Sequence, residues 1–444
     1  MPFVRRETAI LLIGDFISFA FSLWVALFFR NLAIPEAGYF AANLGPFIPV
    51  FLLSLAVFYV AGLYEKQTRI VKRSMGERIA TAQVANVLLA ALFFFLLPLS
   101  IAPKTILAIY LAVSVAIITL WRVSLFPRLL PGVRISAVLV GRGQAVDELF
   151  EEVNGNDRYR ISFASRIGTE GHAAGEISKL VVAATKHGAR VIVLDTRDPS
   201  VGQDLSEIYN ALLGRVSFIE FSEFYEEIFD RVPLGHIDHG WLLESLPRRH
   251  SLYDLAKRVL DVAGSVVGLV LAFPFVLFAA LVLLVQGGQP FIFQERIGRG
   301  GRIIYLLKLR TMLFYDAGDP EKQKKNRVIP FGKFLRVSRV DELPQLWNVL
   351  LGELSFVGPR PEFPKIAAVY EKEIPYYHAR HVVPPGLSGW AQIKDYDAPK
   401  GPADIERTRR KLSYDLYYVK HRSFALDIAI ALKTIRALLA FSGT

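Results

Sequence analysis

The chain of 444 residues contains no cysteine. Disulfide bonds, thiolate zinc sites and cysteine nucleophiles are therefore excluded. The eight histidines also lack the spacing of a metal site, since a close pair such as His378 and His381 is more readily explained as surface or core histidine. The sequence thus offers neither a thiol-based site nor a histidine metal centre.

Acidic residues are fewer than basic ones, 41 against 52, which gives a formal net charge of +11. The chain is nevertheless 52% hydrophobic, with a mean hydropathy of +0.35. An apolar and basic composition indicates a membrane protein with a cationic aqueous part. A nucleic-acid binder is the rival interpretation of the charge, but such proteins are rarely this apolar, so we expect no nucleic-acid partner.

Long apolar runs occupy the first third of the chain. They lie at roughly 9–29, 44–64, 79–99 and 106–126, and each has about the 20 residues that a membrane-spanning helix needs. A signal peptide would have a shorter apolar core and would not be followed by three further spans. Cations cluster before the first run, in the loop 65–78 and after the fourth run, which places both ends of this bundle in the cytoplasm. Residues 1–130 are therefore predicted to form a four-helix transmembrane domain.

A fifth apolar run, Val259–Val285, has Pro274 at its middle and basic residues on both flanks. Proline removes a backbone donor and kinks a helix. A full crossing would put one basic flank outside, whereas a broken helix that enters and leaves on the cytoplasmic face satisfies both flanks. The sequence therefore favours a re-entrant helix at about 255–285, broken at Phe273 and Pro274, over an ordinary fifth span with a proline kink.

Between the two apolar parts the pattern alternates between strand and helix. "RISAVLVGRGQAVDELFEEV" and "GARVIVLDTRD" each contain a buried strand, which predicts a small doubly wound domain over 131–246. Gly141 and Gly143 form the start of a dinucleotide loop, but the third glycine is replaced by Val146. A degenerate Rossmann-like scaffold or regulatory module is therefore favoured over a nucleotide-binding one. Within the connector 221–246, Trp241 is interpreted as an interface anchor.

The segment "SRVDELPQLWNVLLGELSFVGPRPE" contains two adjacent acids, Asp341 and Glu342. Apolar residues follow with a helical period, so the acids lie just before or at a helix N-terminus. Capping of that helix explains one carboxylate well. It explains two less well, because arginines surround them at 336, 339 and 360.

Cations upstream of the acids suggest phosphate chemistry. Lys308 and Arg310 are two apart, a spacing that puts both on one face of a strand. They are either a solvated face against an anionic membrane or a clamp for phosphate oxygens. A carboxylate can attack phosphorus or bind Mg²⁺, and arginines neutralise charge during the transfer.

Five motifs in order over 250–444 resemble the bacterial sugar transferases, the polyprenyl-phosphate phosphoglycosyl transferases of the monotopic type. They are "YDLAKRVLDVAGSVVGLVLAFPF", "QERIGRGGRIIYLLKLRTM", "RVSRVDELPQLWNVLLGELSFVGPRPE", "PPGLSGWAQI" and "KLSYDLYYVKHRSFALDIAIALKT". The whole chain resembles the large, exopolysaccharide-priming members. The expected architecture is an α-helical bundle, an α/β Rossmann-like domain and a mixed, mainly α catalytic domain at 247–444 with its re-entrant helix.

The resemblance implies that a sugar-1-phosphate moves from a UDP-sugar to undecaprenyl phosphate and that UMP is released. It makes Asp341 the nucleophile and the ligand of Mg²⁺, with Glu342 orienting Asp341 or helping to deprotonate the acceptor. The substrate-binding residues expected from the motifs are Gln294, Arg296, Lys308, Arg310, Arg336, Arg339 and Arg360. The chain departs from the family pattern at Phe273, where Ser is common, at Ser388, where Thr is common, and at Trp390, which could bear on sugar or lipid contacts.

The resemblance also implies the setting of the reaction. The catalytic domain is expected on the cytoplasmic face of the bacterial inner membrane, in contact with lipid and compatible with a homodimer. The choice of UDP-sugar and of glycan pathway stays open. The C-terminal segment "SFALDIAIALKTIRALLAF" is expected either on the membrane surface or in the core.

Two other functions remain in competition. A membrane-anchored nucleotide-sugar dehydratase or epimerase would need an intact glycine loop and a Tyr-x-x-x-Lys pair. Tyr253 and Lys257 have that spacing, but they lie outside the βα region and are interpreted as interfacial anchors. A non-catalytic protein of polysaccharide assembly would not need the acid pair or its arginines.

Overall fold

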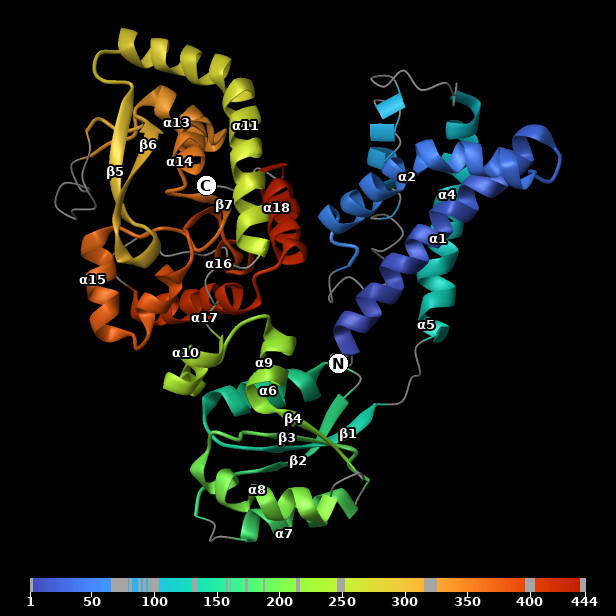
Figure 1. Ribbon diagram of the computed structural model, residues 1–444, viewed down its shortest axis with the longest axis vertical. Helices are drawn as coiled ribbons and strands as arrows, with labels where there is room; N and C mark the ends of the chain where they lie inside the picture. The colour runs from blue at the N-terminus through green and yellow to red at the C-terminus, as the bar shows by residue number, and fades with distance from the viewer. Residues whose placement is uncertain are drawn as a thin grey trace. The chain divides into compact units, whose positions relative to one another are not determined.

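The computed structural model describes two compact units, Met1–Glu227 and Ile228–Thr444 (Figure 1). The described residues are 3–64, 79, 82–86, 89–90, 93–94, 104–129, 134–156, 159, 161–171, 175–186, 188–212, 216–245, 252–314, 326–395 and 404–439. Apolar helices and a parallel sheet belong to the first unit, and the acid pair belongs to the second.

The apolar helices of the first unit match the predicted first, second and fourth spans. They are α1 (Phe3–Asn31), α2 (Ala37–Val60) and α4 (Lys104–Leu120), which continues through the π-helical turn η1 (Trp121–Leu125) into α5 (Phe126–Leu129). By length and composition, Thr8–Asn31, Ala37–Val60 and Ile106–Leu125 could each cross a membrane. The second helix starts earlier than predicted, at Ala37, and continues through Pro46 and Pro49, which membrane helices tolerate. The predicted third span lies largely outside the described residues.

A buried ion pair fastens these helices to one another. Arg122 donates from Nε to Asp15 Oδ1 at 3.0 Å, and the Tyr64 hydroxyl donates to Asp15 Oδ2 at 2.6 Å. Arg122 also donates to the Leu63 carbonyl at 2.8 Å. Charges are buried in an apolar bundle only when they are paired and hydrogen-bonded, so this cluster fixes how α1 meets the end of α4.

A four-stranded parallel sheet forms the α/β part, with strand order β2-β1-β3-β4. The strands are β1 (Ile135–Val140), β2 (Ile161–Ile167), β3 (Val191–Leu194) and β4 (Ser217–Glu220). The helices are α6 (Gln144–Gly155), α7 (Glu176–Lys186), α8 (Pro199–Leu212) and α9 (Phe221–Phe229). Figure 1 shows α7 and α8 on one side of the sheet and α6 on the other. The predicted parallel sheet is confirmed, and the relation to dinucleotide-binding domains stays a prediction.

The carboxyl edge of this sheet, where nucleotides bind in such folds, contains an internal ion pair. Arg142, in the loop between Gly141 and Gly143, pairs with Asp198 at 3.0 Å. The Thr169 hydroxyl donates to the same carboxylate at 2.6 Å. Arg142 is therefore engaged within this unit, and the preference for a scaffold role over nucleotide binding stays a prediction.

The second unit is mixed and mainly helical, as predicted. Its long helix is α11 (Leu252–Val285), and its strands are β5 (Phe291–Ile297), β6 (Ile303–Leu309), β7 (Ser355–Val357) and β8 (Gly386–Ser388). Shorter turns and helices are η2 (Leu234–His236), α10 (His239–Ser245), η3 (Arg299–Gly301), α13 (Pro330–Val337), η4 (Val340–Gln345), α14 (Leu346–Leu351), α15 (Pro364–Glu373), η5 (Tyr377–Val382) and α16 (Trp390–Lys394). The last two helices are α17 (Ile405–His421) and α18 (Phe424–Leu439). β5 and β6 pair antiparallel, and β7 and β8 pair parallel.

Helix α11 is the fourth candidate membrane helix and contains 34 residues. A straight helix of that length would measure about 51 Å, well beyond the ~30 Å of a hydrocarbon core. The helix continues through Pro274, but Figure 1 shows that it bends sharply about halfway along. Phe273, beside that proline, is exposed. The helix is bent but unbroken at Phe273 and Pro274, and a bend fits both a re-entrant helix and a span with a proline kink, so re-entry into the membrane stays a prediction.

Two glycines of α11 allow the helix to pack closely against the rest of the unit. A Cβ at Gly264 would lie 2.8 Å from the Phe356 ring, and one at Gly268 would lie 3.0 Å from Leu346. Arg258, on the same face, donates to the carbonyls at the end of α14, Val349 O at 2.6 Å and Leu350 O at 2.7 Å. These contacts place α11 directly against the elements that carry the acid pair.

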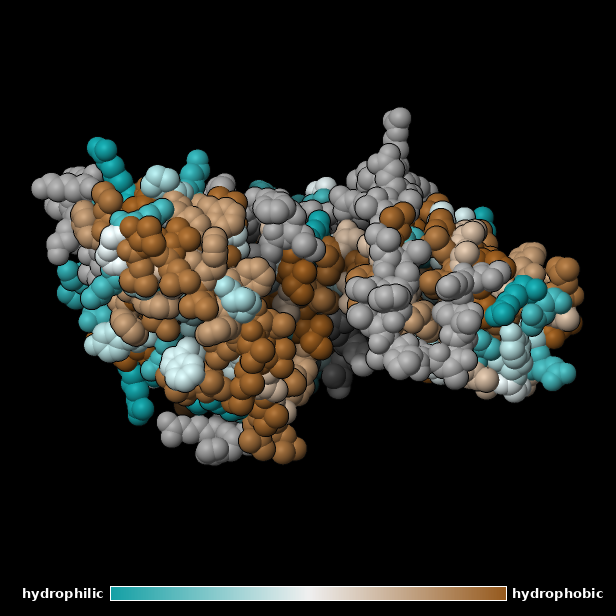
Figure 2. Space-filling view, turned by 90° about the horizontal axis from the view of Figure 1, so that it is seen from above, coloured by the Kyte–Doolittle hydropathy of each residue, from teal (hydrophilic) through white to brown (hydrophobic). Residues whose placement is uncertain are grey.

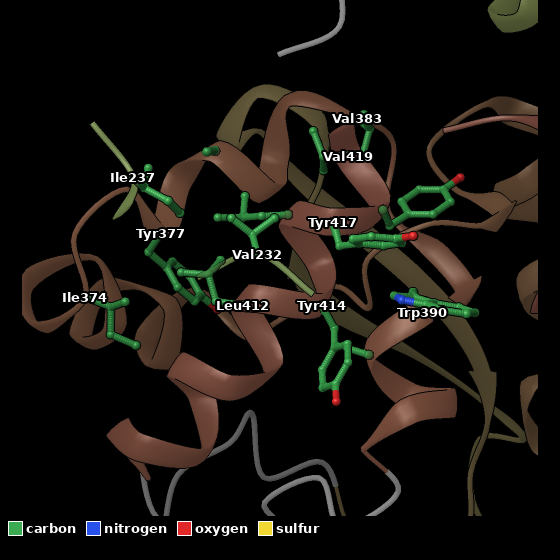
Figure 3. Close-up of a cluster of buried hydrophobic side chains, with 14 of the residues drawn as sticks. Val232, Ile237, Ile374, Tyr377, Val383, Trp390, Leu412, Tyr414, Tyr417 and Val419 are labelled. Carbon is green, nitrogen blue, oxygen red and sulfur yellow. The ribbon is translucent and has the colours of Figure 1, made fainter. Parts of the chain in front are cut away.

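The core of the second unit surrounds α17 (Figure 3). Trp390 is only 5% exposed, and its indole donates to the Asp230 carbonyl at 2.9 Å. It therefore packs in the core, which leaves the suggested sugar or lipid contact without support. Val232 and Trp241 of the connector belong to the same core, so Trp241 is an anchor within this unit.

Helix α18 confirms the core alternative for the C-terminal segment, while contact with the membrane surface stays a prediction. Ile430 is fully buried in the core, and Thr434 hydrogen-bonds to Ser388 at 2.5 Å. Phe424 and Ile428, on another face, are exposed. The helix thus packs on one side and presents apolar surface on the other.

Candidate active site

The acid pair lies in η4, a 3₁₀ turn between α13 and α14. Arg339 precedes it with φ 58° and ψ 14°, the left-handed region that non-glycine residues rarely adopt. This conformation ends α13 and turns the chain into η4. Asp341 and Glu342 occupy the first turn of η4, which confirms their predicted place at a helix start.

Glu342 is held by three cations. Lys308 Nζ lies 2.8 Å from its Oε1, Arg360 lies 3.4 Å from the same oxygen, and Arg339 lies 3.8 Å from Oε2. Burial alone would raise the pKa of Glu342, but the charges of Arg360 and Lys308 outweigh it and hold that pKa well below its usual range. Glu342 is therefore a permanent anion at the centre of a cationic cluster.

Asp341 has the opposite environment. Its side chain is 8% exposed, and its Oδ1 is buried without a hydrogen-bond partner among the described residues. Burial, with the neighbouring charge of Glu342, raises the pKa of Asp341 to about 6. An unsolvated and unpartnered carboxylate oxygen is basic and available for bonding, which suits either a nucleophile or a metal ligand.

Lys308 is another largely buried charge of this cluster. Burial lowers its pKa, and the attraction of Glu342, with a smaller one from Asp341, offsets that effect only in part. Asn348 holds the strand of Lys308 in place, since its side-chain oxygen accepts from Leu307 N at 3.0 Å and its nitrogen donates to Tyr305 O at 2.8 Å. Asn348 was not singled out from the sequence, because an isolated asparagine in an apolar run carries no distinctive signal.

The remaining predicted cations have separate partners. Arg336 Nε donates to the Thr311 hydroxyl at 3.0 Å and is otherwise exposed beside η4. Arg310 donates to the Gly287 carbonyl at 2.7 Å, so it fastens the turn after α11. Lys308 thus contacts the acid pair, whereas Arg310 supports the element next to it.

Gln294 and Arg296 lie on β5, beside the loop 358–362. Arg296 donates to the Gln294 side chain at 3.2 Å, and its guanidinium lies 3.2 Å from the centre of the Phe363 ring. The end of the same strand bonds the loop through Ile297 N and Glu362 O, 2.9 Å apart. The two residues therefore border the loop of Arg360 rather than the acid pair.

A second charged cluster, also missed from the sequence, lies beneath that loop. Its members are Glu362, Arg380, Lys411 and Asp415. Burial would raise the pKa of Glu362, but the charges of Lys411 and Arg380 lower it to about 2. The four residues are spread over more than fifty positions of the chain, so no local sequence pattern predicts that they form a cluster.

The Tyr-x-x-x-Lys pair proves to be a docking contact. Tyr253 and Lys257 both donate to Asp427 Oδ2, each at 2.7 Å, and Tyr418 donates to Asp427 Oδ1 at 2.9 Å. They fasten α11 to α18, which lie side by side in Figure 1. Both side chains are thus engaged in a contact within the unit, which removes the main support for a dehydratase or epimerase, while their interpretation as interfacial anchors stays a prediction.

The fit of Mg²⁺ to this site rests on Asp341. No cluster of three or more acidic or histidine ligands exists among the described residues. Mg²⁺ needs only one or two carboxylates when waters and substrate phosphates complete its shell. The unpartnered Oδ1 of Asp341 supplies one such ligand, while Glu342 is already neutralised by cations. The residues present therefore fit a substrate-bridged Mg²⁺.

Comparison with known proteins places this site in a family. The family described as bacterial sugar transferase matches residues 252–441. The UDP-N-acetylgalactosamine-undecaprenyl-phosphate N-acetylgalactosaminephosphotransferase of Aeromonas hydrophila is 34% identical over 57% of this chain and 59% of its own. The UDP-glucose:undecaprenyl-phosphate glucose-1-phosphate transferase of Caulobacter vibrioides is 39% identical over 42% of this chain and 70% of its own. The exopolysaccharide production protein PSS of Rhizobium leguminosarum is 37% identical over 40% of this chain and 92% of its own.

The chain therefore belongs to the bacterial sugar transferase family, the phosphoglycosyl transferases that the motifs indicated. Its match spans about three fifths of the Aeromonas relative's length, 59%. The matched family region contains the acid pair, all the predicted cations and α11.

Proposed function

We propose that the protein transfers a sugar-1-phosphate from a UDP-sugar to undecaprenyl phosphate, as the first membrane step of exopolysaccharide or other surface glycan synthesis. The observation that carries the proposal is the adjacency of two different acids: Asp341 is buried, with an Oδ1 that has no hydrogen-bond partner among the described residues, and Glu342 contacts three cations. The named relatives act on UDP-sugars and undecaprenyl phosphate, which supports the same substrate classes here.

In the first half-reaction, an oxygen of Asp341 attacks the phosphorus that carries the sugar. A bond forms between that oxygen and phosphorus, and the bond to the bridging oxygen of UMP breaks, so that UMP leaves with the electron pair. In the second half-reaction, a phosphate oxygen of undecaprenyl phosphate attacks the same phosphorus and releases the Asp341 carboxylate. The products are UMP and undecaprenyl diphosphosugar, and no atom is left unbalanced.

Glu342 organises charge in this scheme rather than moving a proton. Its low pKa makes it a poor base, because the carboxylate gains little from protonation near neutral pH. The acceptor also needs little help, since a phosphate monoester is largely dianionic at pH 7. Glu342 instead holds Lys308 and Arg360 where the donor diphosphate would contact them. Bound Mg²⁺ would neutralise diphosphate charge beside Asp341.

The apolar surface of α11 gives a lipid acceptor access to this site. Residues along both limbs of the helix are exposed, among them Leu255, Val259, Val267, Val270, Leu271, Phe275 and Phe278. In Figure 1 the part of α11 after its bend lies at the top. Figure 2 views the molecule from above and shows hydrophobic surface over this second unit. A surface of this kind suits the membrane in which undecaprenyl phosphate is dissolved.

The decisive experiment measures nucleotide release. The purified protein is incubated with Mg²⁺, undecaprenyl phosphate and a panel that includes UDP-glucose and UDP-N-acetylgalactosamine. We expect UMP from at least one donor and none from the Asp341→Asn variant. Release of UDP would indicate an ordinary glycosyltransferase, and the absence of UMP from the whole panel would remove the proposal.

The covalent step has its own test. Without acceptor, a donor labelled with ³²P at the sugar-bearing phosphate should leave label on the wild-type protein. The Asp341→Asn variant should retain no label while its thermal unfolding stays cooperative. Equal labelling of both proteins would exclude Asp341 as the nucleophile.

A further inference from the structure

The loop Gly358–Glu362 is pinned through three of its carbonyl oxygens. The Pro359 carbonyl accepts from Gly386 N at 3.0 Å, and the Glu362 carbonyl accepts from Ile297 N at 2.9 Å. The carbonyl of Arg360 itself accepts from the guanidinium of Arg380 at 2.9 Å. Of these three contacts, the one at Arg360 is the only one made by a side chain, so substitution can remove it.

Arg380 is held as firmly as a side chain can be. It is 2% exposed and pairs with Asp415, which is 1% exposed, at 2.6 Å. Its other terminal nitrogen donates to the Tyr377 hydroxyl at 2.7 Å. Asp415 lies on α17, in the middle of the core of the unit. Two buried, charge-assisted contacts therefore tie the Arg360 backbone to α17: the Arg360 carbonyl accepts from Arg380, and Arg380 pairs with Asp415.

Arg360 is the cation that gains from this support. Its guanidinium shares Glu342 Oε1 with Lys308, at 3.4 Å and 2.8 Å respectively, and its side chain is 38% exposed. A half-exposed arginine has many rotamers, and a fixed backbone confines them to those that reach the acid pair. The flanking prolines add stiffness, but they leave the carbonyl of Arg360 to be fixed by another group.

We propose that Arg380 is a positioning residue, which acts on phosphosugar transfer only by holding Arg360 against the donor phosphates. The proposal rests on the proposed function for its kinetic readout. No contact joins Arg380 to the acid pair among the described residues, and its side chain is only 2% exposed. Its contribution to transfer should therefore vanish once the Arg360 guanidinium is absent.

The variant must separate positioning from folding. Arg380→Met alone would leave Asp415 as a buried, unpaired charge, which destabilises a protein strongly. Arg380→Met combined with Asp415→Leu replaces the ion pair by apolar side chains of similar size, a change that is often tolerated. The matched control is Arg422→Met with Asp254→Leu, which removes another ion pair of this unit, 2.9 Å long, away from the loop.

The test is a double-mutant cycle with Arg360→Ala, in which kcat/KM for UMP release is measured with whichever panel donor the wild type uses. We expect the Arg380/Asp415 variant to lower kcat/KM about tenfold, the value of one charge-assisted hydrogen bond. Added to Arg360→Ala, it should lower kcat/KM by less than about twofold further. The control pair should multiply with Arg360→Ala instead.

Three outcomes would overturn the proposal or separate it from the proposed function. A full multiplicative loss in the Arg360→Ala background, or no loss in the wild-type background, makes Arg380 merely structural. If the wild type releases no UMP, the proposed function fails, and hydrogen exchange of peptides covering 358–363 then decides the inference. Faster exchange there in the Arg380/Asp415 variant, but not in the control pair, supports positioning, and equal exchange refutes it.

Discussion

Asp341 and Glu342 are neighbours in the chain, yet their pKa values move in opposite directions. Burial acts on both, but Glu342 faces Lys308 and Arg360 while one oxygen of Asp341 faces no partner among the described residues. Two titratable groups whose environments separate their pKa values are a common basis for assigning different roles. This difference supports the proposed roles, in which Asp341 would react and Glu342 would organise the cations.

The pH dependence of transfer follows from the pKa of Asp341. Burial raises that pKa to about 6, and only the ionised form attacks, so kcat/KM should fall as pH drops through about 6. Removing the negative neighbour by Glu342→Gln should shift this acid limb to lower pH, although the rate also falls. UMP release measured between pH 5 and 8 checks the shift.

Lys308→Met is the matched opposite change. The charge of Lys308 lowers the pKa of Asp341, so its loss should shift the acid limb to higher pH. Limbs that moved in the same direction in both variants, or did not move, would show that another group controls the profile. Because the two substitutions have opposite signs, general damage to the site cannot imitate the expected result.

The acids and the arginines beside them could be singled out from the sequence, but the buried residues that support them could not. Asp341 and Glu342 are adjacent in the chain, Arg339 lies two residues before Asp341, and Arg360 stands between two prolines, so local patterns single them out. Arg380 and Asp415 meet only because η5 and α17 fold together, and Asn348 lies in an apolar run. Their roles depend on burial and on distant partners, which no spacing rule encodes.

Helix α11 illustrates the same limit at the scale of an element. Its length, apolarity and central proline can be read from the sequence, and the structure contains a long helix that bends about halfway along but is not broken at Pro274. The face of the helix that packs on the rest of the unit could not be predicted. Gly264 and Gly268 form it by close approach to Phe356 and Leu346, which lie far along the chain. Those glycines let the helix pack closely against β7 and α14, and hence bring a candidate membrane helix near the acid pair.

Gly264→Leu should therefore disturb the site through the helix. A Cβ at Gly264 already lies 2.8 Å from the Phe356 ring, and a leucine would have to push α11 away from β7. Overpacking of this kind costs about 1–3 kcal/mol, so we expect a lower midpoint of thermal unfolding together with reduced UMP release.

The control for this substitution is Ala263→Leu. Ala263 precedes Gly264 on α11 and is exposed, so the same side chain meets no neighbour there. Its unfolding midpoint and activity in detergent should remain close to those of the wild type. If both leucines had equal effects, the defect would come from added apolar surface rather than from the close packing at Gly264.

At the scale of the whole molecule, the arrangement in the membrane follows from charge and from α11. The chain has candidate membrane helices at its N-terminal end and a further one at the start of its second unit. Basic residues flank α11 on both sides, so a full crossing would place one cationic flank outside. A helix bent at its middle can instead return to the side from which it entered, which would keep the site and its UDP-sugar in the cytoplasm.

The absence of cysteine makes this topology directly measurable. Single cysteines are introduced at Glu151 in the α/β part and at Arg302 in the turn after β5, both exposed positions on opposite sides of α11 in the chain. A re-entrant helix predicts that both react with a membrane-impermeant maleimide only after the cells are permeabilised. A control cysteine at Leu32, exposed in the loop after the first span, should react in intact cells. Labelling of Arg302→Cys from outside, with Glu151→Cys still protected, would mean that α11 crosses the membrane and that the catalytic unit lies on the other side from the α/β part.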